Sequence, residues 1–193
     1  MNNDPAFFES EVTRALEVLR SGGTILYPTD TVWGLGCAAT DAAAIARIYA
    51  LKQRPDSKSM IVLVGEERDI LQYIAAPDLA AFTFMQEQER PTTVIFDGAV
   101  GLPDNLVAAD GSIAIRIVRD PFCRHLVKRL RVPIVSTSAN ISGEPTAPFF
   151  GAVSEPIRAG VDHVVRWRQD DESPAVPSQI VRWQDGAPVF IRK

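Results

Sequence analysis

The sequence predicts a single α/β domain in which helices flank a twisted, mixed β-sheet. At least seven short runs of β-branched, aromatic and other apolar residues have the composition of buried strands, and helical runs separate several of them. No repeat, low-complexity tract or linker divides residues 1–193. A chain of 193 residues fits one domain or a small pair, and it can bury about 70% of its unfolded surface. We therefore expect one domain with a substantial core.

The first strand–helix–strand unit has the clearest local signals. Thr24–Tyr27 is a β-branched and aromatic run that Pro28 ends, because proline cannot donate a hydrogen bond to a sheet. Asp41 is a favourable N-cap for a helix over Ala42–Leu51, and Met60–Val64 predicts the next strand.

The remaining chain predicts a mixture of helices and strands. Helical spacing, or an Asp-Pro start, predicts helices at Glu9–Arg20, Glu66–Ile74, Asp78–Glu89 and Asp120–Leu130. Apolar runs predict strands at Thr92–Phe96, Gly111–Val118, Val132–Val135 and Val161–Trp167, and a hairpin made of Ser178–Trp183 and Pro188–Arg192 around Asp185-Gly186. The proline-rich stretch Pro145–Pro156 predicts an irregular segment.

Composition and charge exclude several classes of protein. Hydrophobic residues make up 46% of the chain and charged residues 23%, as in ordinary globular proteins. A net charge of −4 makes the chain a poor general nucleic-acid binder, but it leaves room for a local basic cavity. The apolar runs are far shorter than the ~20 residues of a membrane helix, and the N-terminus lacks the features of a signal peptide. Cys37 and Cys123 form no metal-ligand pattern, so we expect a cytoplasmic, reduced protein.

Two polar segments of the first unit predict an anion-binding site. Thr29, Asp30 and Thr31 are expected in a loop just after the first strand, where Gly34 and Gly36 allow close backbone approach. The loop after the helix carries three cations: Lys52, Arg54 and Lys58. Cations and hydroxyls clustered where strands end suit a phosphorylated ligand. The alternative is a solvated helix terminus whose cations complement the helix dipole.

Two later segments could contribute to the same site. Arg116 lies inside an apolar strand, where a guanidinium is costly to bury unless it is paired or binds an anion. A buried pair with an Asp or Glu and an anion ligand both explain this residue. Ser136-Thr137-Ser138-Ala139-Asn140 follows a buried strand, and its small polar side chains leave room for a ligand. A turn that closes on its own backbone is the alternative.

These segments resemble the two signatures of one enzyme family. The run Tyr27–Gly36, followed by Lys52-x-Arg54-Pro55, is similar to the first signature of the YrdC-like family of threonylcarbamoyl-AMP synthases. The run Ser136–Pro145 resembles the second signature. The motifs occur in the family's order and separation, and the resemblance extends from about Phe8 to Arg192. It implies a single YrdC-like domain over residues 1–193.

The resemblance implies an enzyme that makes threonylcarbamoyl-AMP and pyrophosphate from L-threonine, bicarbonate and ATP, for the threonylcarbamoyl modification of tRNA. Lys52 and Arg54 would be catalytic. ATP would contact Arg54, Lys58, Thr93, Asn140 and Arg192, and threonine would contact Thr31, Ser138 and Ser178. Mg²⁺ would accompany ATP, without a tightly bound metal site in the protein. Further expected partners are tRNA or double-stranded RNA and other tRNA-modification proteins, but not a membrane.

Several positions depart from the family pattern. Glu89-Arg90-Pro91-Thr92-Thr93 keeps only the second proline and the threonine of the family's Pro-Gly-Pro-x-Thr turn. Leu63 and Asp97 stand where some members contact threonine with a polar or basic group, and Gln179 replaces the usual Thr. These changes bear on the shape of the turn and on how threonine is held.

A non-catalytic protein is the alternative. The same cavity could hold RNA or a nucleotide without turnover, or the domain could be a scaffold in a tRNA-modifying complex. The chain has no P-loop and no apparent Ser-His-Asp arrangement, and we expect His125 and His163 to be structural. The lack of an obvious nucleophile fits a reaction in which substrates attack each other and the protein positions them.

Overall fold

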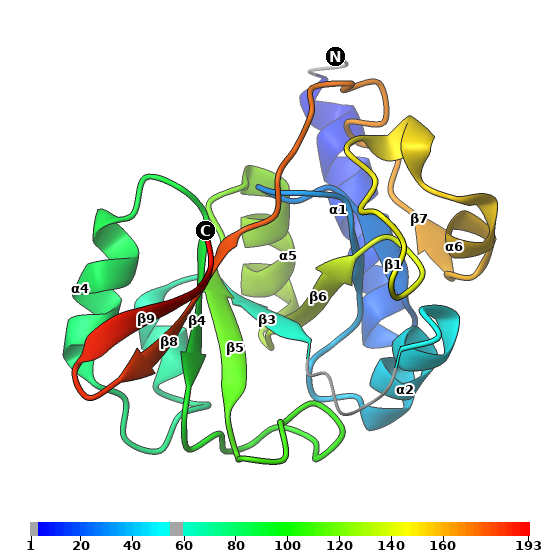
Figure 1. The fold of residues 1–193 in the computed structure, drawn as a ribbon. Coiled ribbons are helices and arrows are strands. Elements are labelled where there is room, and N and C mark those ends of the chain that lie inside the picture. The colour runs from blue at the N-terminus through cyan, green and yellow to red at the C-terminus, as the bar shows by residue number, and fades with distance from the viewer. Residues whose placement is uncertain (1–3, 55–59) are drawn as a thin grey trace.

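Nine short strands of residues 4–54 and 60–193, the part of the chain that the computed structural model describes, form one continuous sheet (Figure 1). The strand order is β7-β1-β2-β6-β3-β5-β4-β8-β9. The pairs β1–β7, β3–β5 and β4–β8 are parallel, and the other neighbours are antiparallel. The predicted α/β class with a mixed sheet is confirmed.

The elements have the following bounds. The strands are β1 (Ile25–Tyr27), β2 (Gly34–Gly36), β3 (Ile61–Val64), β4 (Thr92–Phe96), β5 (Ile113–Ile117), β6 (Ile134–Ser138), β7 (His163–Val164), β8 (Gln179–Gln184) and β9 (Ala187–Arg192). The helices are α1 (Pro5–Arg20), α2 (Ala42–Leu51), α3 (Glu67–Ile70), α4 (Leu79–Glu87), α5 (Pro121–Leu130) and α6 (Glu155–Ala159), with a 3₁₀ turn, η1 (Phe150–Ala152).

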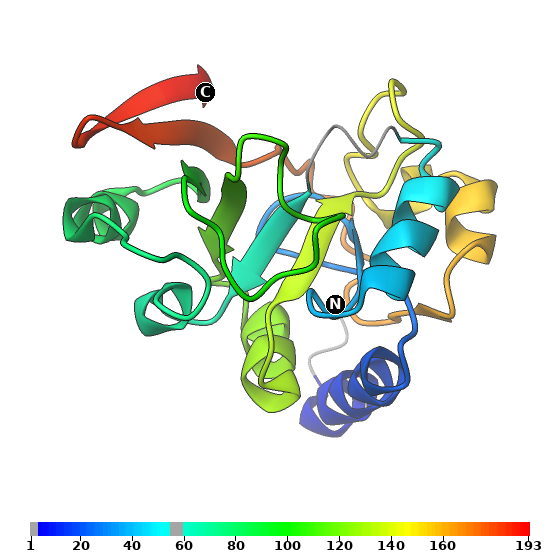
Figure 2. The ribbon, with the colours of Figure 1, turned by 90° about the horizontal axis from the view of Figure 1, so that it is seen from below.

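Helices pack on both faces of the sheet (Figures 1 and 2). Alternating side chains of β3 show the division, because Val62 joins the core beneath α2, α4 and α6 whereas Leu63 joins the core beneath α1 and α5. Phe8 of α1 and Phe122 of α5 meet edge to face, with ring centroids 5.8 Å apart. Helices α1 and α5 cover only part of their face, and the remainder of that face carries the cavity described below.

Asp-Pro pairs explain where α1 and α5 begin. The carboxylate of Asp120 accepts a hydrogen bond from Cys123 N at 2.9 Å, and α5 starts at the predicted position. Asp4 makes the corresponding bond from Ala6 N at 2.9 Å, so α1 starts at Pro5 rather than at the predicted Glu9.

Helices α3 and α4 are shorter than predicted. Beyond Ile70 the chain pairs with another loop, and Val100 N donates to Tyr73 O at 2.9 Å. Helix α4 ends at Glu87, where the backbone of Gln88 turns extended, and the guanidinium of Arg119 donates to Gln88 O at 2.6 Å.

The loops expected at Gly34–Gly36 and Ser136–Ser138 are strand segments instead. They belong to β2 and β6, which pair antiparallel. A Cβ atom on Gly36 would lie 2.6 Å from the ring of Tyr27 and 2.8 Å from Val135 O. The close approach of β1, β2 and β6 therefore requires glycine at this position.

Other predictions agree closely with the structure. Helix α2 has the predicted bounds and its Asp41 cap, and β4 spans Thr92–Phe96 as expected. The β8–β9 hairpin turns at Asp185-Gly186, where both residues have positive φ. The segment expected to be irregular contains η1 and the start of α6. Among residues 4–54 and 60–193, no helix is both long and apolar enough to cross a bilayer.

The carboxylate of Glu11 anchors the chain that follows β7. Glu11 lies in α1 with 0% of its surface exposed. It accepts hydrogen bonds from Arg166 N at 2.6 Å and from Arg166 Nε at 2.9 Å. Because Glu11 takes the backbone N–H of Arg166, β7 ends at Val164 instead of continuing to the predicted Trp167.

Replacing Glu11 by Ala should lower the free energy of unfolding by about 1–3 kcal/mol, since the buried N–H of Arg166 would lose its acceptor. Denaturant unfolding monitored by circular dichroism measures this change. Glu9→Ala is the matched control, because Glu9 lies on the same helix and pairs with Arg129 at the surface. Equal losses in the two variants would show that the buried bond is not the cause.

Candidate active site

A cavity of about 240 Å³ lies on the sheet face that α1 and α5 leave partly uncovered. Segments far apart in the sequence line it, from β2, β3, β4, β5, β6, β8 and β9 and the loops beside them. Six residues predicted as ligands are in its wall: Thr31, Arg54, Arg116, Ser138, Ser178 and Arg192. The three segments from which the sequence predicted an anion site therefore meet at one cavity, through Thr31, Arg54 and Ser138. Lys58 lies outside the described residues.

The loop after β1 presents the hydroxyl of Thr31 to the cavity. The buried hydroxyl of Thr29 donates to Val32 O at 2.8 Å and accepts from Thr31 N at 3.0 Å. Because Thr29 donates its only hydroxyl proton to Val32 O, the Thr31 hydroxyl must be the donor in the 3.0 Å contact between the two hydroxyls. Thr31 therefore retains acceptor capacity for a ligand that carries a hydroxyl or ammonium group.

Arg116 is both a member of a buried pair and part of the cavity wall. Its Nη2 lies 3.0 Å from Asp30 Oδ1, and both side chains are buried. In the described chain, neither Nε nor Nη2 of Arg116 has a hydrogen-bond acceptor of good geometry, although the residue is only 3% exposed. The two explanations of Arg116 from the sequence are thus compatible, because the pair leaves donors available to an anion.

Lys52 lies behind the cavity wall and holds it in place. Its Nζ donates to Ser138 O at 2.5 Å and to Asn140 O at 2.6 Å, while its own carbonyl accepts from Ser142 N at 2.8 Å. The side chain is 1% exposed. Burial, with a further contribution from Arg54, lowers the pKa of Lys52 to about 8. Lys52 does not line the described cavity, so its charge acts through the backbone that carries Ser138.

Asn140 also supports the turn that follows β6. Its Nδ2 donates to Ile141 O at 2.9 Å and to Glu144 O at 2.8 Å. Its Oδ1 is buried without a hydrogen-bond partner among the described residues. The amide is outside the cavity lining, and its predicted contact with ATP stays a prediction.

The opposite wall connects Thr93, Ser178 and Arg192. The hydroxyls of Thr93 and Ser178 are 2.9 Å apart, and Thr93 is fully buried behind Ser178. Arg192 donates from Nε and Nη2 to Ser178 O, at 3.0 and 2.8 Å. The hairpin that carries Arg192 thereby fixes the backbone of Ser178 at the cavity.

Positive charge is concentrated at this cavity in an otherwise acidic chain. Arg54, Arg116 and Arg192 line it, and no Asp or Glu appears among its described lining residues. Burial lowers the pKa of Arg54, and burial together with Arg116 lowers the pKa of Arg192. Cations brought together under partial burial are stabilised by an anionic ligand, which suits phosphate or carboxylate.

Other reactive side chains lie away from the cavity. His125 packs against the ring of Phe8, and His163 lies 3.8 Å from Glu11. Cys37 and Cys123 are buried. In the part of the chain that is described, no cluster of His, Cys, Asp and Glu could hold a metal ion. The polar side chains that line the described cavity are hydroxyls and guanidiniums.

Known proteins match the chain along most of its length. The domain family Sua5/YciO/YrdC, described as "Telomere recombination", matches residues 17–193. A threonylcarbamoyl-AMP synthase of Xanthomonas euvesicatoria is 33% identical over 175 residues, which cover 88% of this chain and 91% of that protein. One of Chromohalobacter salexigens is 36% identical over 143 residues, covering 70% and 74% respectively.

Solved structures share the fold. E. coli YciO superimposes with a TM-score of 0.80 at 24% identity, over 96% of this chain and 89% of that one. P. abyssi Sua5 complexed with L-threonine gives a TM-score of 0.84 at 22% identity, over 95% of this chain and 54% of that one. From the match over residues 17–193 and the identity to the named synthases, the chain belongs to the Sua5/YciO/YrdC family.

Proposed function

We propose that the chain is a threonylcarbamoyl-AMP synthase, which joins L-threonine, bicarbonate and ATP and releases pyrophosphate. One observation carries the proposal: a single cavity combines hydroxyls from Thr31, Ser138 and Ser178 with the guanidiniums of Arg54, Arg116 and Arg192. Its relatives at about a third identity are named for this activity. The product would supply the threonylcarbamoyl group for tRNA modification.

Threonine fits the wall that carries the hydroxyls. Thr31 has acceptor capacity at the cavity, and Ser138 lines the same cavity from β6, where it pairs with Gly34 of β2. Arg116 supplies a cation for a carboxylate or for bicarbonate in the same cavity. This arrangement needs no basic group at Leu63, which is buried beneath α1 and α5, or at Asp97, which pairs with Arg182.

ATP fits the wall that carries Arg54 and Arg192. A cavity of about 240 Å³ is smaller than the ~300–1,000 Å³ that encloses a drug-sized ligand, so the nucleotide would extend beyond the described walls. The phosphates would then lie nearest to the guanidiniums. Mg²⁺ would arrive with ATP and neutralise phosphate charge, and phosphate oxygens and water would hold it, because the described lining offers no carboxylate.

The reaction requires no covalent bond to the protein. The amine of threonine adds to the carbon of bicarbonate and water leaves, which gives a carbamate. An oxygen of the carbamate then attacks the α-phosphorus of ATP, and the bond to pyrophosphate breaks. The protein would hold the reactants in line, and Arg54, Arg116 and Arg192 would stabilise the negative charge on the phosphates and on the carbamate.

Arg54→Ala should lower kcat/KM for ATP by about 10- to 150-fold, because a charge-assisted contact to phosphate is worth roughly 1.5–3 kcal/mol. The assay incubates protein, ATP, bicarbonate and threonine, and follows pyrophosphate release and the adenylate by mass spectrometry. Arg124→Ala is the control, since Arg124 is an exposed cation of α5 outside the cavity. A folded Arg54→Ala variant with the wild-type rate would reject the role of Arg54.

ATP binding by the wild-type protein without pyrophosphate release would instead favour a nucleotide-binding protein.

Threonine selectivity should rest on hydrogen bonds to hydroxyl groups rather than on shape. A site built around a substrate hydroxyl rejects an analogue that lacks it, because the polar groups of the site are left unpaired. Serine should therefore be a better substitute than valine, although valine matches the shape of threonine. Adenylate formation with the three amino acids at equal concentration tests this, and Thr31→Val should reduce the preference for threonine over valine. Equal use of valine and threonine by the wild type would show that no side chain reads the hydroxyl.

A further inference from the structure

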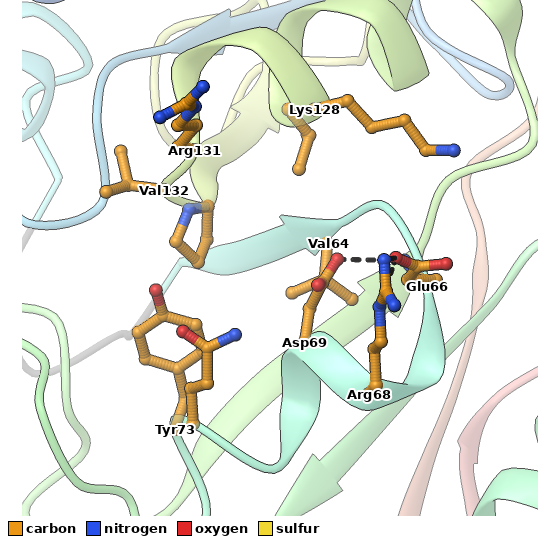
Figure 3. Close-up of a pocket in the computed structure, with 11 residues that line it drawn as sticks. Val64, Glu66, Arg68, Asp69, Tyr73, Lys128, Arg131 and Val132 are labelled. Carbon is orange, nitrogen blue, oxygen red and sulfur yellow. Dashed lines mark hydrogen bonds and ion pairs between the residues drawn. The ribbon is translucent and has the colours of Figure 1, made fainter.

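A second cavity, of about 390 Å³, lies between α3 and the C-terminal end of α5 (Figure 3). It is separate from the candidate active site, although strand β3 contributes to both cavities. Val64 at the end of β3 lines the second cavity, whereas Ile61 at the start of β3 lines the first. The proposed function does not use this cleft, whose volume is within the ~300–1,000 Å³ usual for small-molecule sites.

The base of the cleft is apolar. Val64, Val127, Val132 and Pro133 line it together with the ring of Tyr73. These residues come from β3, the end of α5, the segment that leads into β6 and the turn after α3. A ligand with a compact hydrocarbon body would gain from contact with this surface.

The hydroxyl of Tyr73 is the directional polar group of the cleft. Tyr73 is 9% exposed, and in the described part of the chain its hydroxyl has no hydrogen-bond partner. Figure 3 shows this hydroxyl pointing across the cleft, toward the segment that carries Arg131 and Val132. Burial, and then the charge of Asp69, raises the pKa of Tyr73, so the group remains a neutral donor at physiological pH.

The wall formed by α5 carries positive charge without partners. The side chains of Lys128 and Arg131 are exposed, and within residues 4–54 and 60–193 neither makes a hydrogen bond or ion pair. Cations at the end of a helix also complement its dipole, which is the ordinary explanation for such residues. That explanation accounts for the charges but not for the cavity or for the unpartnered hydroxyl of Tyr73.

The carboxylates on the opposite wall are already engaged. Glu66 pairs with Arg68 at 2.5 Å, and Figure 3 shows the two side chains together. Asp69 Oδ2 accepts from the backbone N–H groups of Gly65 and Glu66, both at 3.0 Å. These bonds stabilise the start of α3, so the charge that is left for a ligand is the positive charge of Lys128 and Arg131.

We propose that this cleft is a binding site for a compact organic anion. Its hydrocarbon body would lie on Val64, Val127 and Pro133, and it would accept a hydrogen bond from the Tyr73 hydroxyl. Its carboxylate or phosphate group would lie between Lys128 and Arg131. The two acid groups share the required chemistry, a negative charge on oxygen next to an apolar body, and the experiment below distinguishes them.

The test is an NMR titration of the full-length ¹⁵N-labelled protein with benzoate, phenyl phosphate and the neutral benzyl alcohol. We expect saturable shifts at Gly65, Tyr73 and Arg131 with at least one of the two anions at concentrations on the order of 10 mM or below, and weaker binding of benzyl alcohol. The stronger anion identifies the acid group. Absence of saturable shifts with both anions, equal binding of benzyl alcohol, or shifts centred on Arg54 and Ser138 would overturn the proposal.

Variants of the cleft residues, compared with a control variant, show which side chains contribute to anion binding. Lys128→Gln combined with Arg131→Gln should weaken anion binding about 10-fold or more, and glutamine is unbranched like the arginine it replaces at the left-handed position 131. Tyr73→Phe should weaken it about 2- to 10-fold while it keeps the buried ring. Arg124→Gln removes an exposed cation of α5 outside the cleft and should leave binding unchanged. If Arg124→Gln weakened anion binding as much as the double variant does, the overall charge of the protein would explain the effect, and the site would be refuted.

Discussion

The buried ammonium group of Lys52 connects the loop after α2, which carries Arg54, to the end of β6, which carries Ser138. It extends from the end of α2 and donates to the carbonyls of Ser138 and Asn140, at 2.5 and 2.6 Å. In the described chain no carboxylate forms an ion pair with it. Its positive charge is therefore stabilised by the two carbonyl groups that accept its hydrogen bonds. The contact holds the backbone of Ser138, whose side chain lines the cavity together with Arg54.

Electrostatics and sheet geometry act together around this contact. The chain has a net charge of −4, yet Arg54, Arg116 and Arg192 line one cavity, with Lys52 behind its wall. Two contacts from loops beside the sheet offset part of this charge, because Asp30 pairs with Arg116 and the carbonyl of Ser178 accepts hydrogen bonds from Arg192. An anionic substrate would offset the positive charge that is concentrated at this cavity, which accounts for a basic site in an acidic protein.

Much of the fold could be predicted because its signals are local. Asp41 and Asp120 cap helices whose starts were expected, and β4 has its predicted bounds. Strand β2 was missed, because Gly34–Gly36 has no strand propensity and pairs only through tertiary contacts. Six of the predicted ligands, among them Thr31 and Arg54, line the cavity, but the position of Lys52 behind its wall could not be predicted. Its acceptors are backbone carbonyls 86 and 88 residues away, which no side-chain pattern reveals.

Titration of Lys52 Nζ by ¹⁵N NMR tests the central claim most directly, namely that a buried, charged Lys52 supports an anion-binding site. The chain has four lysines, so Lys→Arg substitutions can assign the signals. The account predicts a pKa of about 8 in the free protein, and a higher pKa with ATP and Mg²⁺, because a nearby anion favours the protonated amine. A pKa near the ordinary value of 10.5 in the free protein, or one that saturating ATP leaves unchanged, would contradict it.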